Sequence, residues 1–317
     1  QHLLLLDNNV LNTADLKALV DDLCAAGFGR GAKYSDPGAY NIVMMRYRNG
    51  DRADFLDRKM AAYLEGFKKR IKSAEMLETF LQIVIGAEDV DDYAQYMLDH
   101  EEELSPIIEK YRSKVQKARY LDFNQGVDGR KINDENMEQL ARLAIRPLRI
   151  AFDDIRLKDV YCKAVRTAHR HGIKEISNYI LFNYKDKPED LYERLRVNIE
   201  LNKKLGIQIF SFPMKYSPIS ETDRTYIGAN WCKKSIRAIS AILQVTKGVV
   251  AAGSSFFYKA FGNNLDEYFE LLAMPRELIM FRSHFEENGI TAKWKSLYRN
   301  IRHFANIAIN DALGSVN

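Results

Sequence analysis

The stretch that decides the fold is residues 176–213, ISNYILFNYKDKPEDLYERLRVNIELNKKLGIQIFSFP. It begins with an apolar run of strand length and ends, after Gly206, with a second run of the same kind. Between the two runs, Pro188 opens a segment with apolar residues at helical spacing. A proline in the first helical turn and a glycine just past the last are typical helix boundaries. The stretch therefore predicts a strand, a helix and a second strand, the unit from which parallel sheets are built.

The same unit recurs along the chain, with strand-like runs that begin at residues 121, 148, 176 and 207. These starts lie about 30 residues apart, which is the length of one strand with its helix. A further strand is expected at Leu3–Leu6, followed by a helix that Thr13 caps and that ends near Gly27. Five parallel strands with covering helices predict an α/β fold, either an open sheet or a partial (β/α) barrel.

The repeat is interrupted once and then stops, which divides the chain into three parts. The expected core consists of residues 1–27 and 119–219. Residues 28–118 are expected to form a mainly helical insertion, because their apolar residues recur at helical spacing. Residues 220–317 are expected to form a C-terminal helical region that packs on the core.

The charges of the insertion are segregated along the sequence. Residues 46–72 hold nine Lys or Arg against four acids, whereas residues 73–109 hold eleven acids and no Lys or Arg. Two interpretations stay open. The two segments form solvated helix faces that attract each other, or residues 46–109 present a surface for a protein partner or a substrate.

Composition excludes several classes of protein. The 317 residues, 46% of them hydrophobic, are enough for a sizeable core, and the net charge of +4 does not indicate a nucleic-acid partner. No apolar run is long enough to cross a membrane. The three widely separated cysteines, Cys24, Cys162 and Cys232, are typical of packed, reduced thiols, so we expect a cytoplasmic protein.

The strand ends are rich in polar residues, and the carboxyl ends of barrel strands are where chemistry is done. Turn and cap chemistry also favours Asp and Asn at such places, so each residue alone is a weak signal. Together they predict a rim that holds a polar, zwitterionic ligand. The motifs CxxC, HExxH, GxGxxG, GxxxxGK[ST] and GxSxG do not occur in the expected contexts, so neither a zinc site nor a metal-ligand set is predicted.

These segments together resemble a group of radical S-adenosylmethionine (radical SAM) proteins. The resemblance is carried by LLLLDNN at 3–9, DFNQGVDGR at 122–130, PLRIAFDDI at 147–155, ISNYILFNYKDKPEDLYERL at 176–195, IFSFPMKYSPI at 209–219 and YIGANWCKKSIRAISAILQVTKGVV at 226–250. It covers residues 1–27 and 119–290, and each motif alone is weak. The insertion has no recognised counterpart.

The resemblance implies a fold and two cofactors. The fold is a partial parallel (β/α) barrel of radical SAM type. The cofactors are S-adenosylmethionine (SAM) and a [4Fe-4S] cluster held by a CxxxCxxC loop after the first strand. The enzymes of this family cleave SAM reductively to a 5′-deoxyadenosyl radical that acts on a substrate. This sequence contains no CxxxCxxC, and its first strand, Leu3–Leu6, matches the family's second. The cluster ligands are therefore expected upstream of Gln1, unless the barrel is a degenerate form.

The resemblance also implies roles for residues at the strand ends. For the SAM amino group it implies Asp7, Asn8 and Asn9, and for SAM or the substrate it implies Asn124 and Gln125. Further contacts to SAM are implied for Asp153, Asn178, Asn183, Phe212 and Met214, and the substrate candidates are Arg130, Lys215 and Tyr216. Arg130 and Lys215 suit an anionic group, although either is also placed to pair with Asp128 or Asp153.

Two other hypotheses remain beside the radical enzyme. One is a non-catalytic, degenerate barrel that binds SAM or serves as an interaction module through residues 46–109. The other is an unrelated barrel enzyme such as an aldolase or isomerase, for which no Schiff-base lysine or metal constellation stands at a strand end.

Overall fold

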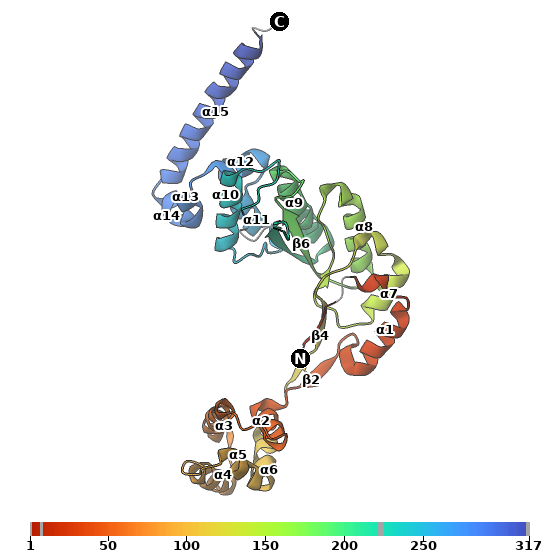
Figure 1. The fold of residues 1–317 in the computed structure, drawn as a ribbon, viewed down its shortest axis with the longest axis vertical. Helices are drawn as coiled ribbons and strands as arrows, with labels where there is room; N and C mark the ends of the chain where they lie inside the picture. Colours follow the sequence, from red (N-terminus) through yellow and green to blue (C-terminus); the bar gives the residue numbers. More distant parts are fainter. Residues whose placement is uncertain (1, 7–8, 221–224, 315–317) are drawn as a thin grey trace. The chain divides into compact units, whose positions relative to one another are not determined.

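A computed structural model of the chain describes residues 2–6, 9–220 and 225–314, with side chains to residue 305 (Figure 1). The chain is of mixed α/β class and divides into two compact units, residues 33–119 and residues 2–32 with 120–317. No closed barrel is present among the described residues. In the same part of the chain, no helix combines the length and apolar character that crossing a bilayer requires.

Among the residues that the structure describes, the larger unit contains five strands, which follow one another in chain order. The first pair is parallel, and so are the two pairings among the last three strands. Parallel bridges from Leu121 to Ile145 and from Val127 to Ile150 connect the two groups. The strands are β1 (His2–Leu5), β4 (Tyr120–Phe123), β5 (Leu148–Arg149), β6 (Glu175–Phe182) and β7 (Gln208–Lys215).

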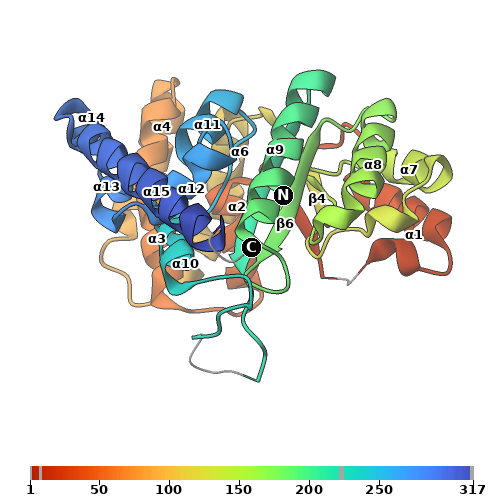
Figure 2. The ribbon, with the colours of Figure 1, turned by 90° about the horizontal axis from the view of Figure 1, so that it is seen from above.

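A helix follows each of the first four strands. The strand residues that alternate toward the helices, such as Leu121 and Ile176, lie in one buried core with them. Figure 2 shows α9 running alongside β6. The helices are α1 (Leu16–Leu23), α7 (Asp134–Ala141), α8 (Lys158–Arg170) and α9 (Pro188–Leu205).

The sequence signals at the helix ends are mostly confirmed. Pro188 is the first residue of α9, and Gly206 ends this helix with φ of 63°, a left-handed conformation that glycine adopts without strain. The prediction that Thr13 caps the first helix is wrong. Asp15 is the cap, because its carboxylate accepts from the Ala18 amide at 2.8 Å, and Thr13 instead closes a short 3₁₀ turn.

The buried guanidinium of Arg194, on α9, ties the sheet to this helix. It is fully buried and donates to the backbone oxygens of Asp153 at 2.8 Å and Leu181 at 2.9 Å, at the carboxyl ends of β5 and β6. It also forms an ion pair with Asp186 at 2.8 Å. The desolvated charge therefore has acceptors on three sides, as a buried charge requires.

The C-terminal region is helical and closes a second core on the far part of β6. Ile180 and Phe182 of that strand lie in this core with Trp231 and Phe257. The helices are α10 (Lys233–Val245), α11 (Ser254–Phe261), α12 (Leu265–Ala273), α13 (Arg276–Met280), α14 (Arg282–Glu287) and α15 (Ile290–Gly314).

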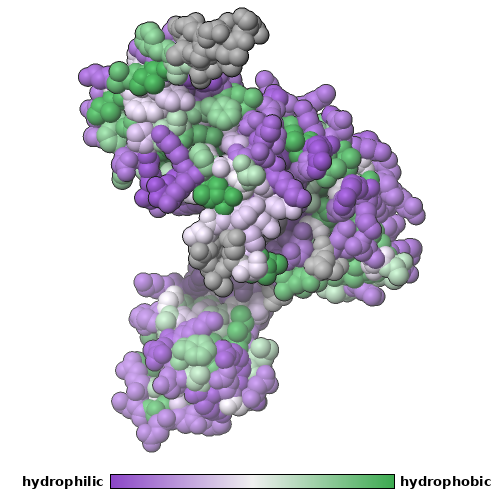
Figure 3. Space-filling view, turned by 45° about the horizontal axis from the view of Figure 1, so that its top comes forward, coloured by the Kyte–Doolittle hydropathy of each residue, from purple (hydrophilic) through white to green (hydrophobic). Residues whose placement is uncertain are grey.

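The smaller unit is a helical bundle with its own core. The chain enters this unit through one strand of an antiparallel pair and leaves it through the other. In this pair Lys33 lies opposite Ala118, and Ser35 lies opposite Gln116. Most of the surface of this unit that is visible in Figure 3 is hydrophilic. Its elements are β2 (Lys33–Ser35), α2 (Gly38–Arg48), α3 (Asp54–Phe67), α4 (Ala74–Gly86), α5 (Tyr93–Asp99), α6 (Glu101–Tyr111) and β3 (Gln116–Ala118).

Two arginines on α9 test the role of the buried ion pair. Arg194→Met leaves Asp186 without its partner and is expected to lower the free energy of unfolding by about 3–5 kcal/mol. Arg196, two residues away, pairs with Glu193 and Glu200 on the surface, so Arg196→Met is expected to cost at most about 1 kcal/mol. Urea unfolding followed by circular dichroism measures both changes. Equal effects of the two substitutions would contradict the role given to Arg194.

Candidate functional site

A cavity of about 360 Å³ lies at the carboxyl ends of β1, β4 and β5. Four of the residues expected at the strand ends line it: Asn9, Gln125, Arg130 and Asp153. The other lining residues are Asn12, Gly126, Val127, Asp128, Gly129, Ala151, Leu157, Val160 and Tyr161. The structure thus brings residues from three separate loops to one place.

Local hydrogen bonds fix the loops around this cavity. The Asn9 side chain accepts from the Leu11 amide at 3.2 Å and starts a short 3₁₀ turn. Gly126 has φ of 81°, and an added Cβ would lie 3.3 Å from the Arg149 backbone oxygen. Only glycine suits both the conformation and the close approach. The polar rim is therefore held by backbone geometry that the sequence encodes locally.

The Asp153 carboxyl is the least compensated acid of the cavity. Its side chain reaches solvent, but the surrounding protein removes part of its hydration, and this burial raises its pKa above the ordinary value. The Leu181 amide and the charge of Arg194 oppose that rise. A carboxylate in such surroundings is stabilised by a cationic ligand group, because the cation replaces the lost hydration.

Arg130 does not offer a free charge to the cavity. Its guanidinium binds Asp128 in a bidentate manner, with distances of 2.9 Å and 2.7 Å, and the hydrogen bonds of this pair hold the pKa of Asp128 below its usual range. The alternative that Arg130 pairs with Asp128 is thus the one observed. Its side chain is 66% exposed, so a substrate contact would have to compete with this pair.

A second polar cluster lies on the sheet face opposite the helices. Arg149 of β5 binds the Asp122 carboxylate through two hydrogen bonds, at 2.8 and 2.7 Å, and donates to Ser177 Oγ at 3.1 Å. Its guanidinium also lies over the rings of Tyr179 and Phe212, 5.3 and 5.9 Å from their centroids. Sequence reasoning missed this cluster except for Phe212. The sequence signal that could have found it is the position of Asp122 between the buried Leu121 and Phe123, because alternate strand residues face opposite sides of a sheet.

Two expected ligand contacts lie outside the cavity and in buried positions. Asn178 points to the helix side of β6 and donates to the Tyr161 hydroxyl at 2.9 Å. Asn183 is fully buried, and its amide donates to the backbone oxygens of Tyr216 and Tyr226 and accepts from the Gly228 amide. These bonds make Asn178 and Asn183 structural in this conformation.

The remaining expected residues are spread over the ends of the strands. Asn124 directly follows β4, and its backbone N–H donates to the Leu5 oxygen at 3.1 Å. Met214 is 50% exposed, and the Tyr216 ring contacts Tyr184 with centroids 4.6 Å apart. Lys215 is half-buried at the end of β7. Asp7 and Asn8 lie outside the described residues.

The chain does not supply a cluster site in its described part. No group of three or more His, Cys, Asp or Glu side chains there is arranged to hold a metal ion. Cys24 is half-buried and Cys162 is buried, as expected for packed thiols. The same expectation is wrong for Cys232, which is exposed at the start of α10 because it caps that helix. Hydrogen bonds from Ser235 hold the pKa of the Cys232 thiol below its usual value.

Comparison with known proteins adds no assignment: no family model, curated protein sequence or solved structure matches this chain.

The two adjacent aspartates make a matched test of the site electrostatics. Because the folded state raises the pKa of Asp153, ionisation of this group disfavours folding as pH rises through that pKa. Asp153→Asn is therefore expected to leave the free energy of unfolding at pH 7 unchanged or to raise it. Asp154→Asn is expected to lower it, because Asp154 binds Arg156 and has a lowered pKa. Urea unfolding of both variants measures the two changes in the free energy of unfolding. A larger loss from Asp153→Asn would contradict the assignment.

Proposed function

We propose that this chain is the SAM-binding part of a radical SAM enzyme, which cleaves SAM reductively to a 5′-deoxyadenosyl radical that acts on a substrate. The observation that carries the proposal is the run of parallel strands in chain order, with a polar cavity at their carboxyl ends. In a doubly wound sheet the strand order reverses at the ligand site. The strands of this chain instead follow one another in chain order, which favours a barrel-type sheet, here a partial barrel. In a barrel, the chemistry takes place at the carboxyl ends of the strands.

The cavity suits the amino-acid end of SAM. Asp153 offers a partly desolvated carboxylate for an ammonium group, and Asn9 and Gln125 offer amides within the same cavity. Amide groups both donate and accept, so they match a carboxylate or ribose hydroxyls. These three side chains would orient the ligand, whereas Asn178 and Asn183 would support the strands beneath it.

The cluster does not fit the described residues, because a [4Fe-4S] cluster is held by cysteine thiolates and the three cysteines here are scattered. When bound, such a cluster supplies the electron that cleaves SAM. The proposal therefore places its ligands outside this chain. On the chain itself, Arg149 with Tyr179 and Phe212 would form the inner wall of the partial barrel and exclude water from the reacting groups.

A second function is favoured by the acidic helices of the smaller unit. Among the described residues, ion pairs engage Glu101, Asp92 and Glu109. Two of these pairs, from Arg48 and Arg52, join the basic and acidic segments, as the interpretation of attracting faces expects. The other acids of residues 73–109 are exposed and have no ion pair in the described chain: Glu75, Glu78, Glu88, Asp89, Asp91, Asp99, Glu102 and Glu103. These exposed acids, referred to below as the acidic surface, would suit a basic protein partner.

SAM binding to the 317-residue chain tests the proposal and separates it from a module that uses the acidic surface alone. Isothermal titration is expected to show one SAM site. Asp153→Asn should weaken binding about tenfold or more, because a charge-assisted hydrogen bond is lost. Asp154→Asn should leave binding unchanged, because that carboxylate faces Arg156 and does not line the cavity.

The pH dependence of the same titration has a defined sign. The ammonium group of SAM needs an ionised Asp153, so binding should weaken as pH falls toward the raised pKa of that carboxyl. An absence of SAM binding, or equal effects of the two substitutions, would contradict the proposal.

A further inference from the structure

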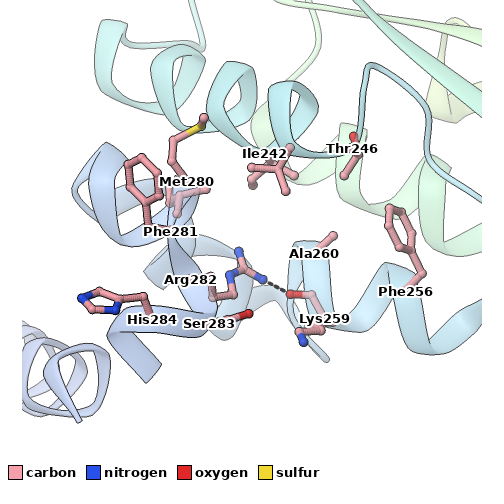
Figure 4. A pocket seen from close by; sticks show the side chains of 12 residues that line it. Ile242, Thr246, Phe256, Lys259, Ala260, Met280, Phe281, Arg282, Ser283 and His284 are labelled. Carbon is pink, nitrogen blue, oxygen red and sulfur yellow. Dashed lines mark hydrogen bonds between the residues drawn. The ribbon is translucent and has the colours of Figure 1, made fainter. Parts of the chain in front are cut away.

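A second cavity, of about 510 Å³, lies among the C-terminal helices and shares no residue with the cavity at the strand ends. Figure 4 shows its walls. Ile242 comes from α10, Phe256 and Ala260 from α11, and Met280 from the end of α13. Its volume lies in the range of small-molecule sites, about 300–1,000 Å³.

The charged groups of this cavity all have one sign. The cations Lys259 and Arg282 line it, and no Asp or Glu is among its lining residues. Arg282 forms no direct ion pair with a carboxylate in the described chain, although the charge of Glu286 acts on it, whereas Arg149, Arg194 and Arg299 each bind a carboxylate directly. Arg282 is half-buried among apolar lining residues, which is an unusual place for a guanidinium without a direct carboxylate partner.

One contact of Arg282 has a structural explanation. Its guanidinium donates to the Lys259 backbone oxygen, near the carboxyl end of α11, where carbonyl groups lack helical partners (Figure 4). This bond uses one of the five donor hydrogens of the guanidinium. Burial also lowers the pKa of Arg282, and the charge of Glu286 opposes this shift only in part, so the hydration that the guanidinium has lost is not fully replaced.

Part of the exposed lining is apolar as well. Phe281 is 63% exposed and Val245 is 53% exposed, and both belong to the lining. Helix capping by Arg282 would not require a chamber with such a rim. An apolar chamber with a single type of charge suits a ligand that has an apolar body and one anionic group.

We propose that this cavity binds an amphiphilic carboxylate, such as a medium-chain fatty acid, with the carboxylate on Arg282 and the chain against Ile242, Phe256 and Met280. Arginine matches a carboxylate because its donors form a planar fork. The site is independent of the proposed function at the strand ends, since the two cavities are built from different elements.

Calorimetric titration of the 317-residue chain with octanoate and with 1-octanol tests the proposal. Octanoate is expected to bind at one site and more tightly than the alcohol. Arg282→Gln should weaken octanoate binding about tenfold or more and leave octanol binding within about twofold. Arg237→Gln, at an exposed arginine on α10 outside the lining, is the matched control and should change neither. No octanoate binding, or equal binding to the Arg282 variant, would overturn the proposal.

A second measurement needs no substitution and so does not depend on whether the variant folds. A diazirine-bearing octanoate is photolysed with the unaltered chain, and the labelled peptides are identified by mass spectrometry. Labels within residues 242–246, 256–260 or 279–284 are expected. Labels confined to other peptides, or an absence of labelling that excess octanoate suppresses, would refute the site.

Discussion

The larger unit depends on how the charge of Arg194 is satisfied away from water. The guanidinium reaches the ends of β5 and β6 from α9, and its carboxylate partner Asp186 also accepts from the Trp231 indole at 3.2 Å. Trp231 belongs to the C-terminal core. One side chain thereby connects the sheet, the helix behind it and the last part of the chain. Because each acceptor is needed to hold a buried charge, the strand ends have little freedom to move apart.

This constraint has a direct consequence for the cavity at the strand ends. Arg194 takes the backbone oxygen of Asp153, so the carboxyl of the same residue is left to face the cavity. The loop is thus fixed by its main chain, while the Asp153 carboxyl is only partly compensated by the Leu181 amide and the charge of Arg194 and has a raised pKa. Groups with such shifted pKa values are common where ligands bind, since the fold tolerates them at some cost in stability. Arg282, in the second cavity, is a cation in a similar position, because burial there lowers its pKa.

Local signals in the sequence were sufficient for the elements and insufficient for their contacts. Pro188 and Gly206 bound α9 because their backbone preferences act without any tertiary partner. Thr13 is not the cap because the helix begins two residues later, where the Asp15 carboxylate accepts from the Ala18 amide. Cys232 was expected in the core, but the helix start to which it belongs leaves it exposed. These outcomes depend on a few neighbouring residues.

The site could be predicted as far as the strand ends and no further. Asn9, Gln125 and Asp153 meet because consecutive parallel strands end at one edge, which the repeat indicates. Asn178 and Asn183 also lie on or next to a strand, yet both side chains point into the protein. The side of the sheet on which a strand residue lies depends on the register of the strand, which the local sequence does not specify. The ion pair of Asp122 with Arg149 joins residues from different strands, so no local sequence motif predicts it.

The most direct test of the central claim is made on the protein expressed from its intact reading frame and reconstituted with iron and sulfide without oxygen. Iron content and the formation of 5′-deoxyadenosine from SAM under reduction are measured together. The account predicts about four irons per chain, as one [4Fe-4S] cluster requires, and deoxyadenosine that depends on both reductant and SAM. A protein that binds no iron and forms no deoxyadenosine would contradict a radical enzyme and leave the acidic helical unit as the place to seek its function.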